Sequence, residues 1–75
     1  MLQLYVRTGC PFCEKVKAFV DEQSILIEEK NIADEHNLEE LLTQGGKPQV
    51  PFLVDGETKM YESDDIITYL GSAHV

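Results

Sequence analysis

Basic residues are scarce in this sequence, which has 6 Lys and Arg against 14 Asp and Glu and a formal net charge of −8. This deficit argues against nucleic acid or an anionic membrane as the main partner, because both attract positively charged surfaces. The sequence also lacks any apolar run near the roughly 18 residues that a membrane span needs. The first expected strand begins at Leu2, so we expect no targeting segment and a cytoplasmic location.

The chain has no internal repeat, no linker-like stretch and no low-complexity tract. Its 75 residues are 43% hydrophobic, an ordinary share for a globular protein that argues against disorder. This length is near the lower limit for a self-sufficient core. We therefore expect one domain covering residues 1–75.

Cysteine is also scarce, and the only two, Cys10 and Cys13, are three positions apart. They lie where an apolar run gives way to a helical pattern, so Cys10 is expected near the unpaired N–H groups at a helix start. That environment favours thiolate and lowers a thiol pKa from about 8.5 towards roughly 3.5–7.5. Pro11 suits the first helical position. Cys13, one turn along, is placed to attack a mixed disulfide formed at Cys10, which indicates a redox pair.

Three other interpretations compete for the two cysteines: small buried hydrophobes, a structural disulfide and half of a zinc site. A structural disulfide usually closes a longer loop, because a very short one removes little unfolded-state entropy. A zinc site needs about four ligands, and the remaining candidates, His36 and His74, lack finger-like spacing. Redox chemistry is favoured, and we expect no metal.

Hydrophobic periodicity and turn residues predict an α/β fold of order βαβαββα with helices on both faces of a small sheet. The charged middle of the second strand predicts an edge position. In the first half of the chain, the pattern predicts a strand at 2–6, a helix at 11–23, a strand at 25–32, and a helix that is capped by Asp34 and ended by Gly45 and Gly46. In the second half, it predicts a strand at 52–54, a tight turn at Asp55 and Gly56, a strand at 58–61, and a helix that is capped by Ser63 and ended by Gly71.

Each predicted helix has apolar positions at helical spacing that are expected to face the core. They are Phe12, Val16, Phe19 and Val20 in the first helix, Leu38, Leu41 and Leu42 in the second, and Ile66, Ile67, Tyr69 and Leu70 in the third.

Three separated motifs together resemble a dithiol glutaredoxin of the thioredoxin fold superfamily. Residues 10–13 resemble its active site, with Phe12 where the family most often has Tyr. Val50 and Pro51 resemble its cis-proline loop, although Gln49 stands where Thr is usual. Residues 61–65 resemble the start of its last helix, and Glu62 with Ser63 is similar to the Glu-Ser pair in the N-terminal domain of glutathione transferases.

The resemblance implies a thioredoxin-like fold, in which a four-stranded mixed sheet is flanked by three helices. It implies parallel first and second strands, an antiparallel hairpin and a cis bond between Val50 and Pro51. It also implies a monomeric glutathione-dependent thiol–disulfide oxidoreductase that acts on glutathionylated or disulfide-bonded proteins. Cys10 would be the nucleophile and Cys13 the resolving thiol. The residues that would bind substrate are Arg7, Pro11, Phe12, Lys47, Gln49, Val50, Pro51, Glu62, Ser63 and Asp64.

Within that set, the N–H groups of Ser63 and Asp64 would receive the γ-glutamyl carboxylate of glutathione, and the Asp64 carboxylate its ammonium group. Lys47 and Gln49 would meet the glycine carboxylate, and Arg7 would favour the Cys10 thiolate. Three alternative functions stay open. They are a thioredoxin-like electron donor served by a flavoprotein reductase, an iron–sulfur cluster protein, and a non-catalytic glutathione-binding module.

Overall fold

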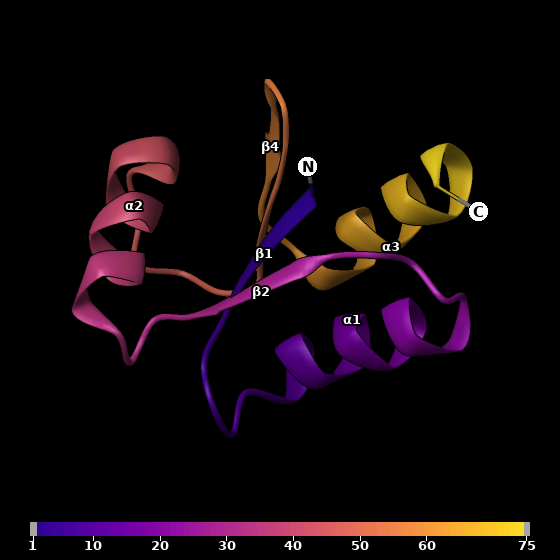
Figure 1. Ribbon diagram of the computed structural model, residues 1–75, viewed down its shortest axis with the longest axis horizontal. Coiled ribbons are helices and arrows are strands. Elements are labelled where there is room, and N and C mark those ends of the chain that lie inside the picture. Colours follow the sequence, from indigo (N-terminus) through magenta and orange to yellow (C-terminus); the bar gives the residue numbers. More distant parts are fainter. Residues whose placement is uncertain (1, 75) are drawn as a thin grey trace.

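A computed structural model of the protein describes residues 2–74, and in this range one four-stranded sheet is covered by three helices (Figure 1). The α2 helix covers one face of the sheet, and α1 and α3 lie together over the other. The elements are β1 (Leu2–Val6), α1 (Pro11–Glu22), β2 (Glu28–Asn31), α2 (Glu35–Gly45), β3 (Phe52–Asp55), β4 (Thr58–Met60) and α3 (Ser63–Ala73).

The strand order is β2-β1-β3-β4, with β1 parallel to β2 and antiparallel to β3, and with β3 antiparallel to β4. This arrangement confirms the thioredoxin-like fold, the mixed sheet and the edge position of the charged second strand. The register pairs Leu4 with Glu29 on one side and with Leu53 on the other. The apolar strands β1 and β3 are thus central, and the polar strand β2 takes an edge.

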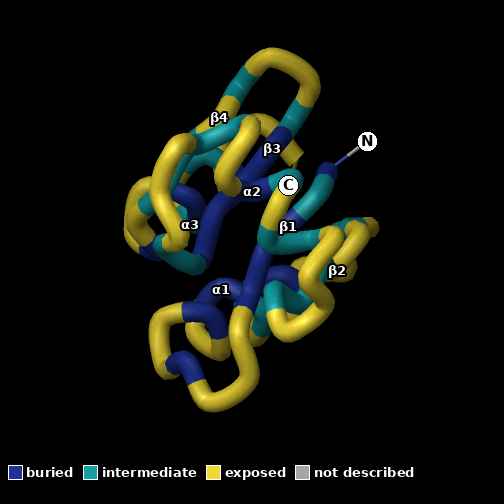
Figure 2. Tube along the Cα trace, turned by 90° about the vertical axis from the view of Figure 1, so that its left-hand side faces the viewer, coloured by how far each residue is buried: buried dark blue, intermediate teal, exposed yellow. Residues whose placement is uncertain are grey.

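Alternation along the two central strands sends side chains to opposite faces of the sheet. Leu4 and Leu53 join the larger core under α1 and α3, whereas Tyr5, Phe52 and Val54 join a smaller core under α2. Figure 2 shows this burial along β1 and β3 and the exposed outer surfaces of the helices. The sequence therefore builds two unequal cores on one sheet.

The ends of α2 follow the residues predicted for them. The Asp34 side chain accepts a hydrogen bond from the His36 N–H at 2.9 Å, and Gly46 closes the helix in the left-handed region with φ +85°. A short polar acceptor caps free N–H groups, and glycine adopts positive φ without steric penalty.

Several predicted ends differ from the structure by one residue, and three differences are more informative. The second strand begins at Glu28 rather than residue 25, because its ladder pairs only with Gln3–Val6 of β1 and Ser24 turns the chain with φ +54°. Ser63 is the first helical residue of α3, and Glu62 holds the cap position instead. Helix α3 also continues past Gly71 to Ala73, because Gly71 does not adopt the left-handed conformation with which Gly46 closes α2.

Two predicted core residues are exposed. Phe12 is 61% exposed, because the inward face of α1 is formed by Cys13, Val16 and Val20 instead. Leu42 is also exposed, and Leu41 is the buried residue of α2. The rest of each predicted stripe is confirmed, because Val16, Val20 and Leu41 are buried and only Phe12 and Leu42 lie outside.

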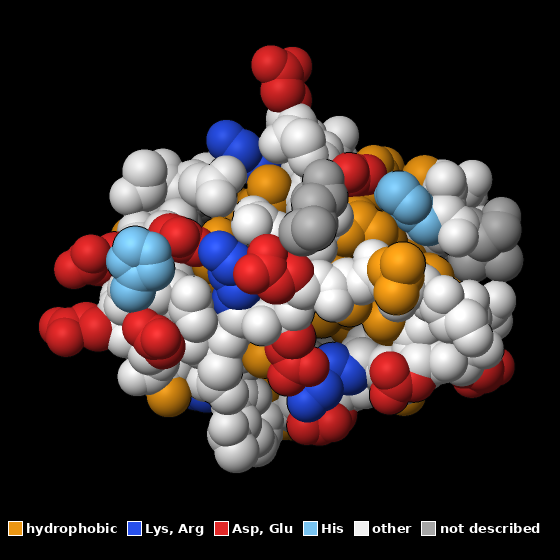
Figure 3. Space-filling view, in the orientation of Figure 1, with side chains coloured by type: hydrophobic (Ala, Val, Ile, Leu, Met, Phe, Trp, Pro, Cys, Tyr) orange, Lys and Arg blue, Asp and Glu red, His pale blue; other side chains and the backbone are white. Residues whose placement is uncertain are grey.

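Charged side chains of both signs lie on the surface, and acidic ones outnumber basic ones in the sequence. On the face seen in Figure 3, acidic and basic groups stand side by side near the centre, and hydrophobic atoms gather towards α3. None of the helices in residues 2–74 has the length and apolar character needed to cross a bilayer.

Candidate functional site

Cys10 occupies the N-cap of α1, with an extended backbone at φ −86° and ψ 112°. Gly9 has φ +82°, which makes the sharp turn from β1 into the helix, and Pro11 occupies the first turn. The Cys10 Sγ accepts a hydrogen bond from the Cys13 backbone N–H at 3.2 Å. The sulfur thus does what a capping oxygen does elsewhere, since it accepts from an otherwise unpaired N–H group.

Cys10 is only 4% exposed, and burial alone would raise its pKa. Hydrogen bonds from the Cys13 side chain and from the backbone N–H groups of Cys13 and Phe12, together with the Arg7 charge, outweigh burial. The pKa of Cys10 therefore lies below its usual value. Cys10 is a buried sulfur that the helix start nevertheless favours as thiolate.

Cys13 is fully buried, and its pKa moves in the opposite direction. Burial raises the pKa of Cys13 to about 12, with a further contribution from its hydrogen bond and charge interaction with Cys10. Both residues are free thiols. The pair therefore combines a sulfur that ionises readily with a neighbour that keeps its proton and donates it.

A pocket of about 320 Å³ lies beside the exposed Phe12 ring of the cysteine motif. One wall is the loop of Gln49, Val50 and Pro51, and the peptide bond between Val50 and Pro51 is cis, as predicted. The other wall is the start of α3, and the full lining is Phe12, Gln49, Val50, Pro51, Glu62, Ser63 and Asp64. Val50 also packs against the core cluster that contains both cysteines. The fold thus brings all three sequence motifs to one place.

The α3 wall begins with an unusual backbone conformation. Glu62 has φ +63°, a region that side-chain-bearing residues seldom adopt, and it makes no side-chain capping hydrogen bond among the described residues. Ser63, which follows it, is buried. Ser63 and Asp64 line the pocket, so a helix start without a side-chain cap forms part of its wall, and such a helix start is suited to an anion.

The substrate-binding residues predicted from sequence are only partly gathered at the pocket. Asp64 lines it but is already paired with Lys15 of α1, and the Gln49 amide lies 3.5 Å from the Glu62 carboxylate. The remaining three, Arg7, Pro11 and Lys47, are exposed and do not line the pocket. Their binding roles stay predictions, as do those of the residues that line it.

Two features of this site have no clear signal in the sequence. The ion pair between Lys15 of α1 and Asp64 of α3 joins residues that are 49 positions apart in the sequence. The sequence indicates Gly45 only as a helix end, yet it makes room for Tyr61, whose hydroxyl would lie 2.1 Å from a Cβ at that position. Both depend on long-range packing, which local spacing does not encode.

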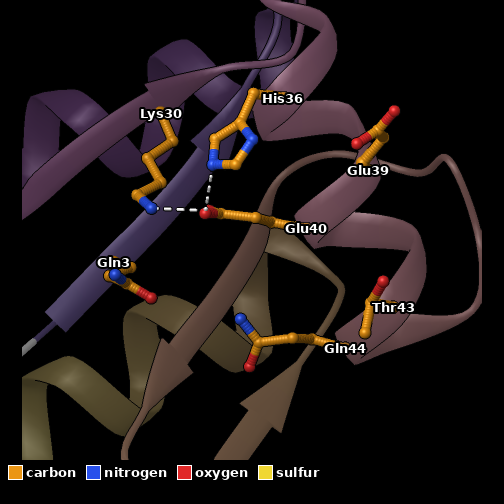
Figure 4. Close-up of a pocket in the computed structure, with 7 residues that line it drawn as sticks. All are labelled: Gln3, Lys30, His36, Glu39, Glu40, Thr43 and Gln44. Carbon is orange, nitrogen blue, oxygen red and sulfur yellow. Dashed lines mark hydrogen bonds and ion pairs between the residues drawn. The ribbon is translucent and has the colours of Figure 1, made fainter.

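A second cavity, of about 380 Å³, lies between α2 and the β1–β2 edge (Figure 4). Lys30 and His36 converge on the Glu40 carboxylate, at 2.6 and 3.1 Å. The buried Tyr5 hydroxyl donates to Glu40 at 3.0 Å and accepts from the Gln44 amide at 3.3 Å. The Lys30 ammonium, the Glu40 carboxylate and the Tyr5 hydroxyl beside this cavity are thus already paired within the protein.

Metal-ligating residues do not gather in the part of the chain that the structure describes: residues 2–74 contain no group of three or more His, Cys, Asp or Glu side chains arranged to hold an ion. The absence of a metal in the protein stays a prediction.

Comparison with known proteins gives two kinds of relatives. Residues 4–75 match the family described as the glutathione S-transferase N-terminal domain. Among curated proteins, the chain is 29% identical over 66 residues to glutaredoxin 1 of Rickettsia prowazekii (strain Madrid E), covering 84% of this chain and 70% of that protein. It is 35% identical over 51 residues to glutaredoxin 1 of Rickettsia felis, covering 64% and 50%.

Similar solved structures include glutathione transferases. A glutathione S-transferase from the Antarctic clam Laternula elliptica is 34% identical, with a TM-score of 0.80 over 95% of this chain and 34% of that chain. Human glutathione transferase theta-2 has a TM-score of 0.83 at 24% identity, over 96% of this chain and 31% of that one, which supports the fold alone. The chain thus spans about a third of the length of these transferases. Both resemblances identified from the sequence are confirmed, and the chain belongs to the glutathione S-transferase N-terminal domain family.

Proposed function

We propose that this protein is a glutathione-dependent thiol–disulfide oxidoreductase that reduces glutathione mixed disulfides and protein disulfides through Cys10 and Cys13. The observation that supports it most strongly is the position of Cys10 Sγ at the start of α1. There it accepts the Cys13 N–H and has a lowered pKa, and Phe12 of the same motif shares a pocket with the Val50–Pro51 loop. A thiolate is the attacking species in disulfide exchange, so this position supplies the nucleophile.

In the proposed first step, the Cys10 thiolate attacks the glutathione sulfur of a mixed disulfide. The old S–S bond breaks, the target leaves as a thiolate that takes a proton, and a Cys10–glutathione disulfide forms. A free glutathione thiolate then attacks the glutathione sulfur of that disulfide. This step releases oxidised glutathione and restores the Cys10 thiolate, so each turnover consumes one free glutathione, whose sulfur supplies the electron pair.

Cys13 supplies a second route. Its pKa of about 12 keeps it protonated in the reduced protein. Once Cys10 has become part of a disulfide, its negative charge is gone, so one cause of the raised Cys13 pKa disappears. The Cys13 thiolate can then attack Cys10 Sγ, release glutathione and close an internal disulfide, which two further glutathione molecules reduce. This route suits protein disulfides.

The pocket provides complementary groups for glutathione, which carries two carboxylates and one ammonium group. The uncapped N–H groups at the start of α3 suit the γ-glutamyl carboxylate. Asp64 would take the ammonium group, which requires Lys15 to release it. Both side chains of that ion pair are largely exposed, so the exchange has a small energetic cost.

The relatives add support of a different kind. The curated relatives are named glutaredoxin 1, and the human theta-2 transferase was crystallised in complex with glutathione. Since the chain covers only part of these proteins, the activity proposed here rests on its own thiol geometry. The proposal also includes a cytoplasmic location, where paired cysteines are more often catalytic than structural.

Turnover of a glutathionylated peptide with glutathione as electron donor tests the proposal. Cys10→Ser should abolish turnover, because a serine hydroxyl does not form the mixed disulfide, whereas Cys13→Ser should keep much of it. Loss of activity in Cys13→Ser with activity retained in Cys10→Ser would reverse the two roles. A chain that turns over only with a flavoprotein reductase would favour the thioredoxin-like alternative.

A further inference from the structure

Tyr61 connects the two walls of the pocket beside the cysteines. It lies just beyond β4, directly before Glu62 of the α3 wall. Its hydroxyl donates to the Lys47 backbone oxygen at 3.0 Å and accepts from the Lys47 N–H at 3.2 Å. Lys47 begins the loop that continues into Gln49, Val50 and the cis bond. One side chain thus attaches the segment before α3 to the loop that forms the opposite wall.

Packing fixes this side chain from three directions. The Tyr61 ring lies 4.6 Å from the Phe52 ring, measured between centroids, and the Lys47 ammonium lies 5.0 Å above it. Gly45, at the end of α2, lies under the hydroxyl. A Cβ there would meet the Tyr61 hydroxyl oxygen at 2.1 Å and its Cζ at 2.9 Å. Only a residue without a side chain lets the hydroxyl reach the Lys47 backbone.

We propose that Tyr61 is a positioning residue, whose hydroxyl sets the separation of the two pocket walls and so the fit of the glutathione moiety. This inference rests on the function proposed above. Tyr61 lies outside the residues that line the pocket, so it acts through the loop and through Glu62 rather than by contact. Gly45 supports it by leaving the space that the hydroxyl occupies.

The variant Tyr61→Phe removes both hydrogen bonds and keeps the ring contacts with Phe52 and Lys47. A hydrogen bond contributes about 0.5–1.5 kcal/mol, so we expect the KM for glutathione to rise about 2- to 10-fold. The kcat and the alkylation rate of Cys10 should be unchanged, because the thiolate environment belongs to α1. A merely structural loss would lower thermal stability without changing KM at a temperature where the variant stays folded.

Tyr69→Phe is the matched control. Tyr69 also donates a hydroxyl hydrogen bond, at 2.5 Å to Asp55, but at the hairpin, away from the pocket lining. Removing it is expected to cost similar stability and to leave KM at the wild-type value. An equal rise in KM in both variants would overturn the proposal.

Gly45→Ala gives an independent test through the same hydroxyl. In the wild-type background the new methyl group collides with the hydroxyl oxygen, so KM should rise at least as much as in Tyr61→Phe. In the Tyr61→Phe background the closest contact is gone, although the Cζ contact persists, so the further rise should be clearly smaller. If the factors by which the two single variants raise KM simply multiply in the double variant, the assignment of Gly45 as the support of the Tyr61 hydroxyl is overturned.

Amide NMR spectra separate failure of this inference from failure of the proposed function. Tyr61→Phe should shift the amide signals of Gln49 and Val50 on one wall and of Ser63 on the other, and Tyr69→Phe should not. A wild-type chain that neither binds nor turns over glutathione overturns the proposed function, and with it the assignment of glutathione to this pocket. Unchanged wall signals in Tyr61→Phe overturn the positioning role, whatever the activity.

Discussion

The cavity under α2 and the pocket beside the cysteine motif differ in how far their polar groups are already paired within the protein. In the cavity under α2, Lys30 is 14% exposed and Glu40 is 30% exposed, and their ion pair is completed by the hydroxyl of the buried Tyr5. In the pocket beside the cysteines, Phe12 is exposed, the start of α3 has no side-chain cap and Glu62 has a positive φ. The larger cavity is therefore the less promising binding site.

The same contrast extends to the cores beneath them. Ten buried residues, including both cysteines, pack on the α1 and α3 face, and four pack on the α2 face. The smaller core is supplemented by the polar network around Tyr5. The larger core itself contains the buried thiol pair, and the open pocket lies on the same side, between the cysteine motif and the start of α3. In this small domain, the candidate site thus lies on the face with the greater apolar burial.

The largest effect is expected from truncating each core at its centre. Ile66 and Leu41 are both fully buried, on the larger and the smaller face. Such a truncation to Ala typically costs about 2–5 kcal/mol, and more where the surroundings collapse less. We expect Ile66→Ala to lie in the upper half of that range and Leu41→Ala in the lower half, as measured by urea unfolding.

The reason for that difference is the size of the two cores, because Ile66 belongs to a cluster of ten buried residues and Leu41 to a cluster of only four. A larger loss of stability in Leu41→Ala than in Ile66→Ala would show that the polar network makes the smaller face the more rigid one.

The next effect concerns the ionisation of Cys10. A side-chain hydrogen bond from Cys13 is the largest of the causes that lower the Cys10 pKa. Cys13→Ala removes that donor and keeps the backbone N–H, so the pKa should rise yet stay below the ordinary thiol value. The rate of Cys10 alkylation below that pKa should fall, by about tenfold for each unit of rise. Glu40→Gln, in the other region, should leave the alkylation profile unchanged.

Much of the fold followed from local features of the sequence. The apolar strands, the Asp34 cap, the glycine end of α2 and the charged edge strand each reflect a short-range preference that the final packing also satisfies. The prediction that the cysteine motif and the Val50–Pro51 loop lie near each other came from the family resemblance rather than from the residue pattern. Periodicity alone gives no information on which distant loop faces a helix start.

The errors occurred where tertiary packing overrides local preference. Phe12 has the spacing of a core residue, but Cys13 takes the inward position because the thiol must lie against β1 and α3. Gly71 has the sequence signature of a helix end, yet α3 continues through it to Ala73 because it does not adopt the positive φ that closes α2 at Gly46. The pairing of Tyr61 with Gly45 and Lys47 joins three elements, so no window of sequence contains it.

A smaller effect is expected from the hydroxyl of Tyr5. Burial, followed by the Glu40 carboxylate, raises the pKa of Tyr5, so the phenol stays protonated and donates. Tyr5→Phe removes this donor, although Lys30 and His36 still pair with Glu40. We expect a loss of about 1 kcal/mol in urea unfolding. Cys10 alkylation should not change, and a change there would mean that the two faces are coupled through β1.

The smallest effect is on acid stability, where each region contributes one carboxylate. Hydrogen bonds from Lys30 and then Tyr5 lower the pKa of Glu40, and hydrogen bonds from Tyr69 and then His74 lower the pKa of Asp55. A carboxyl group whose pKa is lower in the folded than in the unfolded protein stabilises the folded state. This stabilisation is fully present above the pKa of the group in the unfolded protein, which is about 4 for both residue types. That stability is lost as pH falls through the folded value. Glu40→Gln and Asp55→Asn should therefore be less stable than wild type near pH 6 and approach it at pH 3 or below, in urea unfolding at each pH. A deficit that stays constant across this range would mean that shape, rather than charge, is what these residues contribute.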